Sequence, residues 1–586
     1  MAKKNKITLK IDDVQIQVDE GTTILDAAEQ LGIRIPRLCY HPDLSLAGSC
    51  RVCIVDVKGM GFYMTACSSR VWEGMEVQTN SPEIRQARRD IVELLIDNHP
   101  MDCQTCDRDG NCELQNLAYS MGVRARHFEG RRKRFPIELS SHSVVRDSEK
   151  CVLCGRCVRV CSEIQGVNNL SQHGRGFNTV VGPAHLANMD ESVCIQCGQC
   201  INVCPTAAFL EKRSAGTVWE AIANPEMHVV VQTAPSIRAA IGEGFGLPPG
   251  TPATGKMVTA LRRLGFDRVF DTDFGADLTI IEEAHEFLTR LKSGPLPMIT
   301  SCSPGWVSFM EKFYPELIPH ASTCRSPMSM LSVLIKTYYA EQEHIDPKKV
   351  FVVAVMPCVA KKYEASRPEH QMPDGAPYTD AVLTTRELIW MIKCYGIHFA
   401  GLPDGEFDAP LGLASGAGDI FGTTGGVMEA TLRAASELVT GKPADRLEFT
   451  EVRAVEGLRE TYVAIGDQNI HIGVANGLTN AKILLDKVKA GKDPFHVIEV
   501  MACPGGCIGG GGQPYPPEGV KVLDPDLLRK RAGALYSIDS GKKLRKSYEN
   551  PAIDEVYSSF LGTPGGQKAH ELLHTHYQAR LPRGVR

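Results

Sequence analysis

Hydrophobic and polar residues alternate at the start of the chain. Residues 7–11 and 14–18 place apolar side chains at every second position, on either side of an Asp12–Asp13 turn. This period of two predicts a β-hairpin. The next segment, residues 22–32, has helical periodicity and predicts a helix that ends at Gly32. The chain therefore begins with a small domain that combines strands and a helix.

From about residue 213 onward, continuous apolar runs replace this alternation. Four such runs, broken by Pro, Gly or Cys, cover residues 228–236, 295–302, 350–358 and 496–503. Continuous apolar runs are typical of strands buried on both faces, as in parallel sheets. Together with the helical stretches between them, they predict a large α/β domain.

Cysteines stand at the ends of three of these runs, at Cys302, Cys358 and Cys503, and Cys507 follows closely. Ligands in open α/β sheets gather at the carboxyl ends of the strands. The four thiols are therefore expected to converge on one site. The alternative is that each is a separate buried residue, since cysteine is a common small core residue.

Length, composition and charge narrow the class of protein. With 586 residues the chain exceeds the usual size of a single core, so several domains are expected. A net charge of −5 gives no reason to expect nucleic acid or an anionic membrane as partner. No apolar run approaches the roughly 18 residues of a membrane span, and no secretory signal is visible. We expect a soluble, cytoplasmic protein whose cysteines bind metal rather than form disulfides.

The 21 cysteines are unevenly distributed, with fifteen of them between residues 39 and 204. The first group is Cys39, Cys50, Cys53 and Cys67. Its spacing approximates the plant-type [2Fe–2S] pattern of a clustered trio and a remote cysteine. A zinc site with four thiolates is the alternative. The hairpin and helix around the group resemble a β-grasp ferredoxin, which favours the [2Fe–2S] cluster.

A second group combines one histidine with three cysteines: His99, Cys103, Cys106 and Cys112. Alone, this spacing is nearly as typical of a zinc knuckle as of an iron–sulfur site. Its position among iron–sulfur motifs favours a [4Fe–4S] cluster with one histidine ligand.

The third group consists of two runs with the spacing C-x2-C-x2-C-x3-C. In two-cluster ferredoxins the fourth cysteine of each run binds the other cluster. The first predicted [4Fe–4S] cluster therefore takes Cys151, Cys154, Cys157 and Cys204. The second takes Cys194, Cys197, Cys200 and Cys161. Four clusters in succession predict a path for electrons.

Three segments of the second part carry a family resemblance: TSCSPGW (300–306), MPCVAKKYEA (356–365) and MACPGGCIGGGG (501–512). In order and spacing they resemble the signature segments of [FeFe]-hydrogenases. The upstream cluster motifs resemble those of the longer members of that family, so the resemblance covers essentially the whole chain. It is strongest to the catalytic subunits of multimeric NAD(P)-linked [FeFe]-hydrogenases.

With this resemblance, the patterns predict a multidomain protein of the α+β and α/β classes. The expected domains are a β-grasp [2Fe–2S] domain (1–82), a small His/Cys3 [4Fe–4S] domain (83–140), a bacterial-ferredoxin-like two-cluster domain (141–212) and a large α/β hydrogenase domain with parallel sheets and a C-terminal small-subunit-like segment (213–586).

The resemblance implies an H-cluster, a [4Fe–4S] cubane joined through a bridging cysteine to a two-iron centre with CO, cyanide and a dithiolate. By position, Cys358 and Cys503 hold the cubane and Cys507 is the bridge. Lys361 is expected to donate to a cyanide, which suits an ammonium beside an anionic ligand. The residues expected to line the two-iron centre are Ala234, Pro235, Ser236, Met356 and Met501.

One position departs from the family pattern. Where the family usually has two adjacent cysteines, the first relaying protons and the second binding the cubane, this chain has Cys302 and Ser303. By position Ser303 falls on the ligand, but iron cubanes prefer thiolates. Cys302 is therefore favoured as the ligand after a local shift, and Ser303 would carry the proton less readily. Cys324 and Cys394 are expected to be structural thiols.

The resemblance also implies a proton path through Glu283, Ser322, Glu286 and Arg290. Glu283 and Glu286 are three residues apart, so one helix face can present both. Without the resemblance, these charges would be interpreted as a solvated helical surface.

The implied function is the reversible oxidation of H2 to protons and electrons. The clusters would pass the electrons to a flavin-containing subunit that reduces NAD(P), with small iron–sulfur subunits and ferredoxin as further partners. No flavin or Rossmann motif is visible in this chain. The alternatives are an H2 sensor and a non-catalytic electron-transfer subunit, because residues 1–210 also resemble the iron–sulfur subunit of respiratory NADH dehydrogenases.

Overall fold

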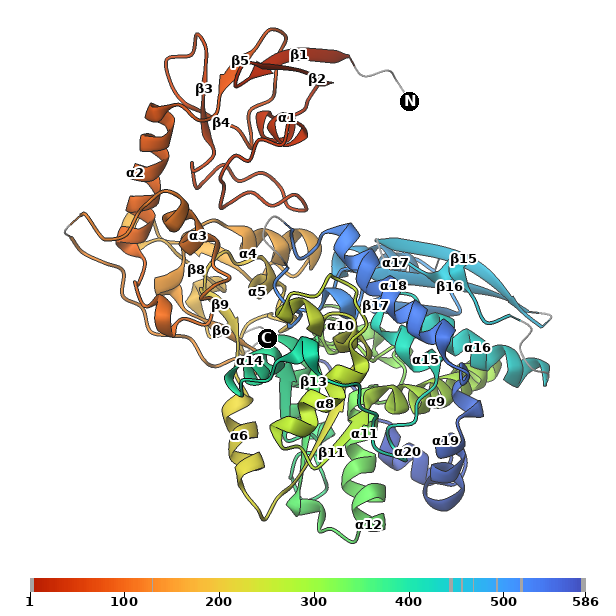
Figure 1. The fold of residues 1–586 in the computed structure, drawn as a ribbon. Helices are drawn as coiled ribbons and strands as arrows, with labels where there is room; N and C mark the ends of the chain where they lie inside the picture. Colours follow the sequence, from red (N-terminus) through yellow and green to blue (C-terminus); the bar gives the residue numbers. More distant parts are fainter. Residues whose placement is uncertain are drawn as a thin grey trace.

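The computed structural model describes residues 5–128, 130–441, 446–454, 457–466, 468–491, 494–516 and 520–580. An N-terminal sheet lies at one end of the molecule, short cysteine-rich helices follow, and a large α/β part fills the other end (Figure 1). The protein is multidomain, as the sequence predicts. In the described part of the chain, no helix combines the length and apolar character that crossing a membrane requires.

The N-terminal domain is a mixed five-stranded sheet with one short helix, α1 (Ile24–Gln30). Its strands, in sheet order, are β2 (Val14–Asp19), β1 (Lys6–Ile11), β5 (Glu76–Gln78), β3 (Ile54–Val57) and β4 (Met64–Thr65). β1 and β2 pair antiparallel, which confirms the predicted hairpin. Asp12 and Asp13 at its turn have φ values of 46° and 65°, which a two-residue hairpin turn requires.

Short helices carry the cysteine groups that follow. α2 (Pro82–Asn98) and α3 (Glu113–Ser120) flank the second group, and each run of the third group bends into a helix, α4 (Arg156–Arg159) or α5 (Gln199–Val203). Both short helices begin after a glycine with positive φ, 69° at Gly155 and 75° at Gly198. Two antiparallel strand pairs complete this region: β6 (Val144–Arg146) with β9 (Phe209–Glu211), and β7 (Ser171–His173) with β8 (Val180–Gly182).

The large domain contains two four-stranded sheets. The first is wholly parallel, in the order β11 (Arg268–Asp271), β10 (His228–Thr233), β13 (Val350–Met356) and β14 (Ala381–Thr384). The second has the order β12 (Met298–Ile299), β17 (Val497–Met501), β16 (Gln468–Asn476) and β15 (Leu458–Ile465), of which only β15 is antiparallel to its neighbour. The four predicted apolar strands are β10, β12, β13 and β17, which confirms a mixed α/β domain with parallel sheets.

A long buried helix, α9 (Thr272–Ser293), packs against α11 (Pro327–Leu334) and α16 (Gly426–Thr440) in this domain. The end of the chain wraps around it, since α19 (Pro551–Val556) contacts α9 and α20 (Gln567–Leu573) contacts α11. The remaining α-helices are α6 (Ala215–Ala223), α7 (Pro235–Arg238), α8 (Thr254–Leu264), α10 (Pro304–Phe313), α11 (Pro327–Leu334), α12 (Ala340–Gln342), α13 (Ala360–Ser366), α14 (Thr385–Cys394), α15 (Gly416–Asp419), α16 (Gly426–Thr440), α17 (Leu478–Lys489) and α18 (Pro525–Gly541).

Candidate active site

The carboxyl ends of strands from both sheets meet at one apolar cavity of about 80 Å³. β12 leads into Cys302, β13 into Cys358 and β17 into Cys503, and Cys507 follows in the next turn. All four residues line the cavity. The structure therefore brings together the four cysteines predicted from the strand ends, and it does so from two sheets rather than one.

The setting of these thiols fits metal binding. Burial raises the pKa of all four, and that of Cys507 reaches about 12. Charge on Cys358 is the second cause at both Cys503 and Cys507, so these three thiols are close enough to repel one another as thiolates. A bound metal cation reverses this balance, because it deprotonates its thiol ligands. The donor set therefore suits an iron–sulfur group.

Cys302 and Ser303 both line the cavity but face different neighbours. After burial, the charge of Glu283 contributes most to the raised pKa of Cys302. Ser303 is the N-cap residue of α10, and its hydroxyl accepts a hydrogen bond from the Ala502 N–H at 3.3 Å. Cys302 thus lies on the side of the α9 glutamates, and Ser303 lies beside the loop that carries Cys503.

Lys361 supplies the cation of the cavity wall. Its Nζ donates to the Glu364 carboxylate at 2.6 Å, to the Ser326 hydroxyl at 2.7 Å and to the Cys302 carbonyl at 3.3 Å. The side chain is buried, so its ammonium is held in one place by neutral and charged acceptors. Ser326 and Glu364 were not predicted as neighbours of Lys361, although Glu364 lies within the 356–365 segment.

Most of the residues predicted to surround the two-iron centre line this cavity. Ala234, Pro235, Met356 and Met501 are all on its wall. Ser236 is fully buried behind them, and its hydroxyl accepts a hydrogen bond from Gln513 Nε2 at 3.3 Å. The cavity also has lining residues that were not predicted: Thr272, Pro304, Pro327, Met328, Pro357, Phe421 and Ala502.

Glycines around the cavity allow backbone segments to approach one another. A Cβ on Gly506 would lie 2.7 Å from the Thr424 nitrogen, and one on Gly510 would lie 2.4 Å from the Pro357 oxygen. Gly506 also has a φ of 91°, a conformation that favours glycine. Glycine at these positions therefore lets the protein close around the cavity.

The four residues predicted to relay protons lie together. Glu283 is 1% exposed, and neither of its carboxylate oxygens has a hydrogen-bond partner among the described residues. Burial, followed by the charge of Glu286, raises the pKa of Glu283 to about 8. The Ser322 hydroxyl donates to Glu286 at 2.8 Å, and Arg290 donates to the same carboxylate at 2.6 Å. This arrangement runs from the Cys302 side of the cavity to the partly exposed end at Arg290.

Sequence reasoning missed two buried groups beside this path. Cys324, expected to be only structural, lies with its thiol 3.6 Å from Oε2 of Glu286 and donates to it. Glu499 is fully buried in β17, and its carboxylate accepts the N–H groups of Gly425 and Met428, each at 2.7 Å. Burial raises the pKa of Glu499 to about 7. The only sequence signal for Glu499 is one charged residue inside an apolar run.

The region that carries the two C-x2-C-x2-C-x3-C runs, residues 151–204, packs directly against the cavity. We call it the two-run region. Gln199 and Asn202 donate from α5 to the carbonyls of Gly509 and Gly510, at 3.0 and 3.3 Å. A Cβ on Gly511 would lie 2.6 Å from the Cys197 carbonyl, so glycine is what permits this contact. Charge on Cys503 adds to the raised pKa of Cys197, which places these two cysteines near one another across the domain boundary.

Both predicted groups of four cysteines in this region are brought together. The first shares one small cavity, lined by Cys151, Cys154, Cys157 and Cys204. In the second, burial raises the pKa values of Cys161, Cys197 and Cys200, and the charge of Cys194 raises each of them further. The fourth cysteine of each run thus lies with the other run, as its spacing predicts.

The first cysteine group lies close to this region. The Cys39 N–H donates to Cys50 Sγ at 3.4 Å, and the Sγ atoms of Cys53 and Cys67 are 3.4 Å apart. Arg159 Nη2 donates to the carbonyls of Cys39 and Cys154, at 2.6 and 3.3 Å. One guanidinium therefore links a cysteine of the N-terminal domain to a cysteine of the two-run region.

The His99 group reaches the same region from another side. His99 is 9% exposed and its Nδ1 has no partner among the described residues, while burial lowers its pKa to about 4. The imidazole is therefore neutral, as a metal ligand must be. Burial raises the pKa values of Cys103 and Cys112, and the charge of Cys106 raises both further. Arg108, which lies between Cys106 and Cys112 in the sequence, donates to the Cys204 carbonyl at 3.0 Å.

Models of known families match successive parts of the chain. The model for the iron only hydrogenase large subunit, C-terminal domain, matches residues 227–511, and that for the iron hydrogenase small subunit matches 525–580. Upstream, the 2Fe-2S iron-sulfur cluster binding domain matches 4–82, the NADH-ubiquinone oxidoreductase-G iron-sulfur binding region matches 88–127, and the 4Fe-4S dicluster domain matches 150–208.

Curated proteins and solved structures agree with these matches. The chain is 50% identical to the NADP-reducing hydrogenase subunit HndD of Solidesulfovibrio fructosivorans, over 98% of the chain and 99% of that protein. It is 43% identical to iron hydrogenase 1 of Clostridium pasteurianum, over 97% of the chain and 100% of that protein. A structure of the apo [FeFe]-hydrogenase HydA1 from Chlamydomonas reinhardtii has 44% identity and a TM-score of 0.56, covering 62% of this chain and 98% of that one.

Proposed function

Since this chain belongs to the iron-only hydrogenase family and is a hydrogenase with its own electron-transfer domains, we propose that it oxidises H2 reversibly at the cavity between its two sheets. The observation that carries this proposal is the convergence of four thiols and the Lys361 ammonium on one apolar cavity. Apolar walls with a few placed polar groups are what a buried catalytic group requires.

Cys358, Cys503 and Cys507 are the residues that would hold an H-cluster, with Cys507 as the bridge. When bound, that group supplies the iron chemistry that splits H2 heterolytically. Lys361, oriented by Glu364 and Ser326, would present its ammonium to an anionic ligand. The apolar wall of the cavity keeps water out.

The surroundings of Cys302 support a role for its thiol as the first proton carrier, rather than the ligand role preferred from its chemistry alone. It lies on the Glu283 side of the cavity, whereas Ser303 lies beside the Cys503 loop, which supports Ser303 as the position of the fourth cubane ligand. From Cys302 the proton passes to Glu283, then by way of Ser322 to Glu286, and leaves at Arg290. Glu283 suits this step because a pKa of about 8 lets it both take up and release a proton near neutrality.

Electrons would leave through the accessory clusters. The proposed accessory clusters are one [2Fe–2S] at the Cys39 group and three [4Fe–4S]. One [4Fe–4S] lies at the His99 group, and the other two lie at the mixed groups, each of which takes three cysteines from one run and one from the other. The first mixed group contains Cys204, and the second contains Cys161. The contact of Cys197 with the Cys503 loop supports transfer from the cavity to the two-run region. Arg159 and Arg108 support two onward branches, because they tie the Cys39 and Cys112 segments to cysteines of the first mixed group.

We propose that the chain works in a complex. The curated relative with 50% identity is called a subunit of an NADP-reducing hydrogenase. The flavin and NAD(P) sites would then reside in a partner subunit, and ferredoxin would be a further acceptor. The test is H2-dependent reduction of viologen and of NADP⁺ by the matured, isolated chain. We expect viologen reduction without NADP⁺ reduction. An inactive chain would contradict the hydrogenase proposal, and direct NADP⁺ reduction would contradict the partner proposal.

A further inference from the structure

A further group of metal-binding side chains lies where the end of the chain packs on α9. Glu286 on α9, Cys324 before α11 and His574 after α20 each offer one ligand atom, and these atoms all lie within 4.8 Å of one another. Cys324 and His574 are buried, and Glu286 is partly exposed. A thiol, an imidazole and a carboxylate are the donors that zinc takes in proteins.

Backbone hydrogen bonds hold these three side chains together. Cys324 and His574 lie opposite each other on antiparallel segments, and the Thr575 N–H donates to the Thr323 carbonyl at 2.7 Å between them. The Thr323 N–H in turn donates to both carboxylate oxygens of Glu286 at 3.1 Å. Three segments that are distant in the sequence thus share one hydrogen-bonded frame. Such support is what a metal site of defined geometry requires.

His574 is oriented as a metal-binding histidine usually is. Its Nε2 lies 3.1 Å from Oε2 of Glu282, a buried carboxylate that also accepts the Gly565 N–H at 2.9 Å. A carboxylate beside one ring nitrogen holds the proton there and leaves the lone pair on the other nitrogen for the metal. The ligand atom is therefore Nδ1, which lies 2.7 Å from the Thr323 hydroxyl.

Glu286 keeps one oxygen on the side of Cys324. Arg290 donates to Oε1 of Glu286 at 2.6 Å, whereas the Cys324 Sγ lies 3.6 Å from Oε2. Burial, followed by the charge of Glu286, raises the pKa of the Cys324 thiol. A divalent cation at this place would have the opposite effect, because it deprotonates a thiol that binds it. One thiolate and one carboxylate would then balance its two charges.

We propose that Glu286, Cys324 and His574 bind a divalent transition-metal ion such as Zn²⁺, with Glu282 as the carboxylate that orients His574. Three protein ligands leave the fourth position of a tetrahedral ion to water. The effect on turnover rests on the proposed function, because the Ser322 hydroxyl of the proton path donates to the same Glu286 oxygen, Oε2, at 2.8 Å. A carboxylate beside a cation holds a proton poorly, so the bound metal inhibits turnover.

The test uses the matured holoprotein with Zn²⁺ as the probe. Equilibrium dialysis gives the zinc affinity, and X-ray absorption at the zinc edge counts the sulfur ligands. H2-dependent viologen reduction is titrated with Zn²⁺ beside them, and each protein is compared with its own zinc-free rate. The variants are Cys324→Ser and His574→Gln. The matched control is Cys394→Ser, which changes an exposed cysteine at the end of α14. Iron analysis checks that zinc leaves the clusters intact.

We expect one sulfur ligand at about 2.3 Å from zinc in the parent and the control, and none in Cys324→Ser. Zinc affinity should fall about ten-fold or more in both variants, and the zinc concentration for half-inhibition should rise by the same factor. A zinc environment without sulfur in the parent, or equal affinity in all four proteins, would overturn the inference. Zinc that binds through Cys324 without slowing turnover would confirm the metal site and contradict the proposed proton path instead.

Discussion

Replacement of Glu283 by glutamine removes a proton carrier while leaving its shape. Glu283 is buried on α9, and its carboxylate oxygens have no hydrogen-bond partner among the described residues. With a pKa of about 8, the side chain is mostly protonated at neutral pH, so the neutral amide of Glu283→Gln is close to it in size and charge. The amide cannot give up its proton to Ser322 or Glu286.

The expected loss follows from the role of Glu283 as a general acid and base. Removal of such a group typically costs about 10²–10⁴-fold in rate. We expect H2 oxidation and proton reduction to fall by that factor in Glu283→Gln, with the iron content unchanged. In the parent, H2 oxidation should rise with pH toward about 8, because ionised Glu283 accepts the proton, and proton reduction should fall through the same range.

The same shift in pKa makes the stability of the fold depend on pH. Burial raises the folded pKa of Glu283 from its ordinary 4.5 to about 8, so between these values the folded chain holds a proton that the unfolded chain has lost. The parent should therefore lose stability relative to Glu283→Gln as pH rises through this window, by about 1.4 kcal/mol per pH unit at most. The assays are viologen-coupled turnover against pH, iron analysis and denaturant unfolding of parent and variant at pH 5 and 8. Near-parental turnover in Glu283→Gln would refute the relay.

Three further perturbations test other contacts of the site. Cys302→Ala should abolish turnover while the protein keeps its iron, and loss of iron on analysis would return Cys302 to the role of cubane ligand. Gly511→Ala should slow reduction of the accessory clusters by H2 about ten-fold or more, since its methyl would meet the Cys197 carbonyl at 2.6 Å; unchanged rates in stopped-flow absorbance would contradict that route. Arg159→Met should loosen the N-terminal domain and raise its proteolysis rate, with Arg175→Met as control; equal rates would show that this guanidinium does not hold the domain.

Much of the site could be predicted because the decisive information is local in the sequence. Continuous apolar runs that end in Cys302, Cys358 and Cys503 indicate parallel strands and place the thiols at their carboxyl ends. The exchange of Cys161 and Cys204 between the two runs follows from spacing alone. The structure groups these cysteines as predicted. The division of the strands between two sheets was not predictable, because the apolar pattern of a strand does not determine which strand it pairs with.

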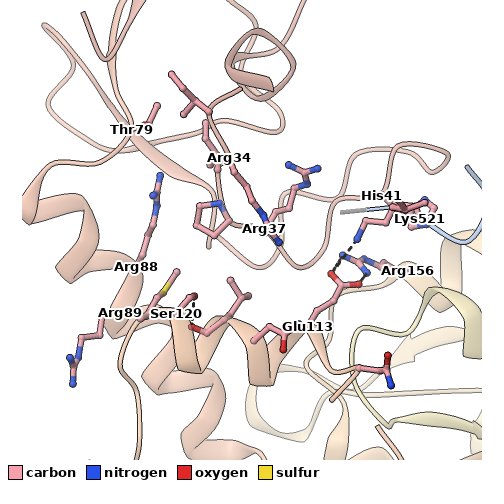
Figure 2. A pocket seen from close by; sticks show the side chains of 18 of the residues that line it. Arg34, Arg37, His41, Thr79, Arg88, Arg89, Glu113, Ser120, Arg156 and Lys521 are labelled. Carbon is pink, nitrogen blue, oxygen red and sulfur yellow. Dashed lines mark hydrogen bonds and ion pairs between the residues drawn. The ribbon is translucent and has the colours of Figure 1, made fainter. Parts of the chain in front are cut away.

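Other features depend on tertiary contacts that no motif carries. Cys324 becomes a neighbour of Glu286 only because the segment before α11 packs on α9. Ser236 follows two cavity-lining residues in the sequence, yet the turn at α7 directs it to Gln513. The cleft between the N-terminal sheet domain and helices α2 and α3 is lined by Arg and Lys side chains from segments that are distant in the chain (Figure 2). The overall composition therefore gives no sign of this local positive charge. The ligand and relay assignments themselves stay predictions, as does the cytoplasmic location.

The most direct test of the central claim is the infrared spectrum of the matured protein and of its Cys507→Ala variant. If the cavity between the two sheets holds the two-iron centre through Cys507, the parent shows bands of iron-bound CO and cyanide. The variant then loses these bands, while the electron paramagnetic resonance signals of the accessory clusters remain. Absence of the bands in the matured parent, or their persistence in Cys507→Ala, would contradict the account.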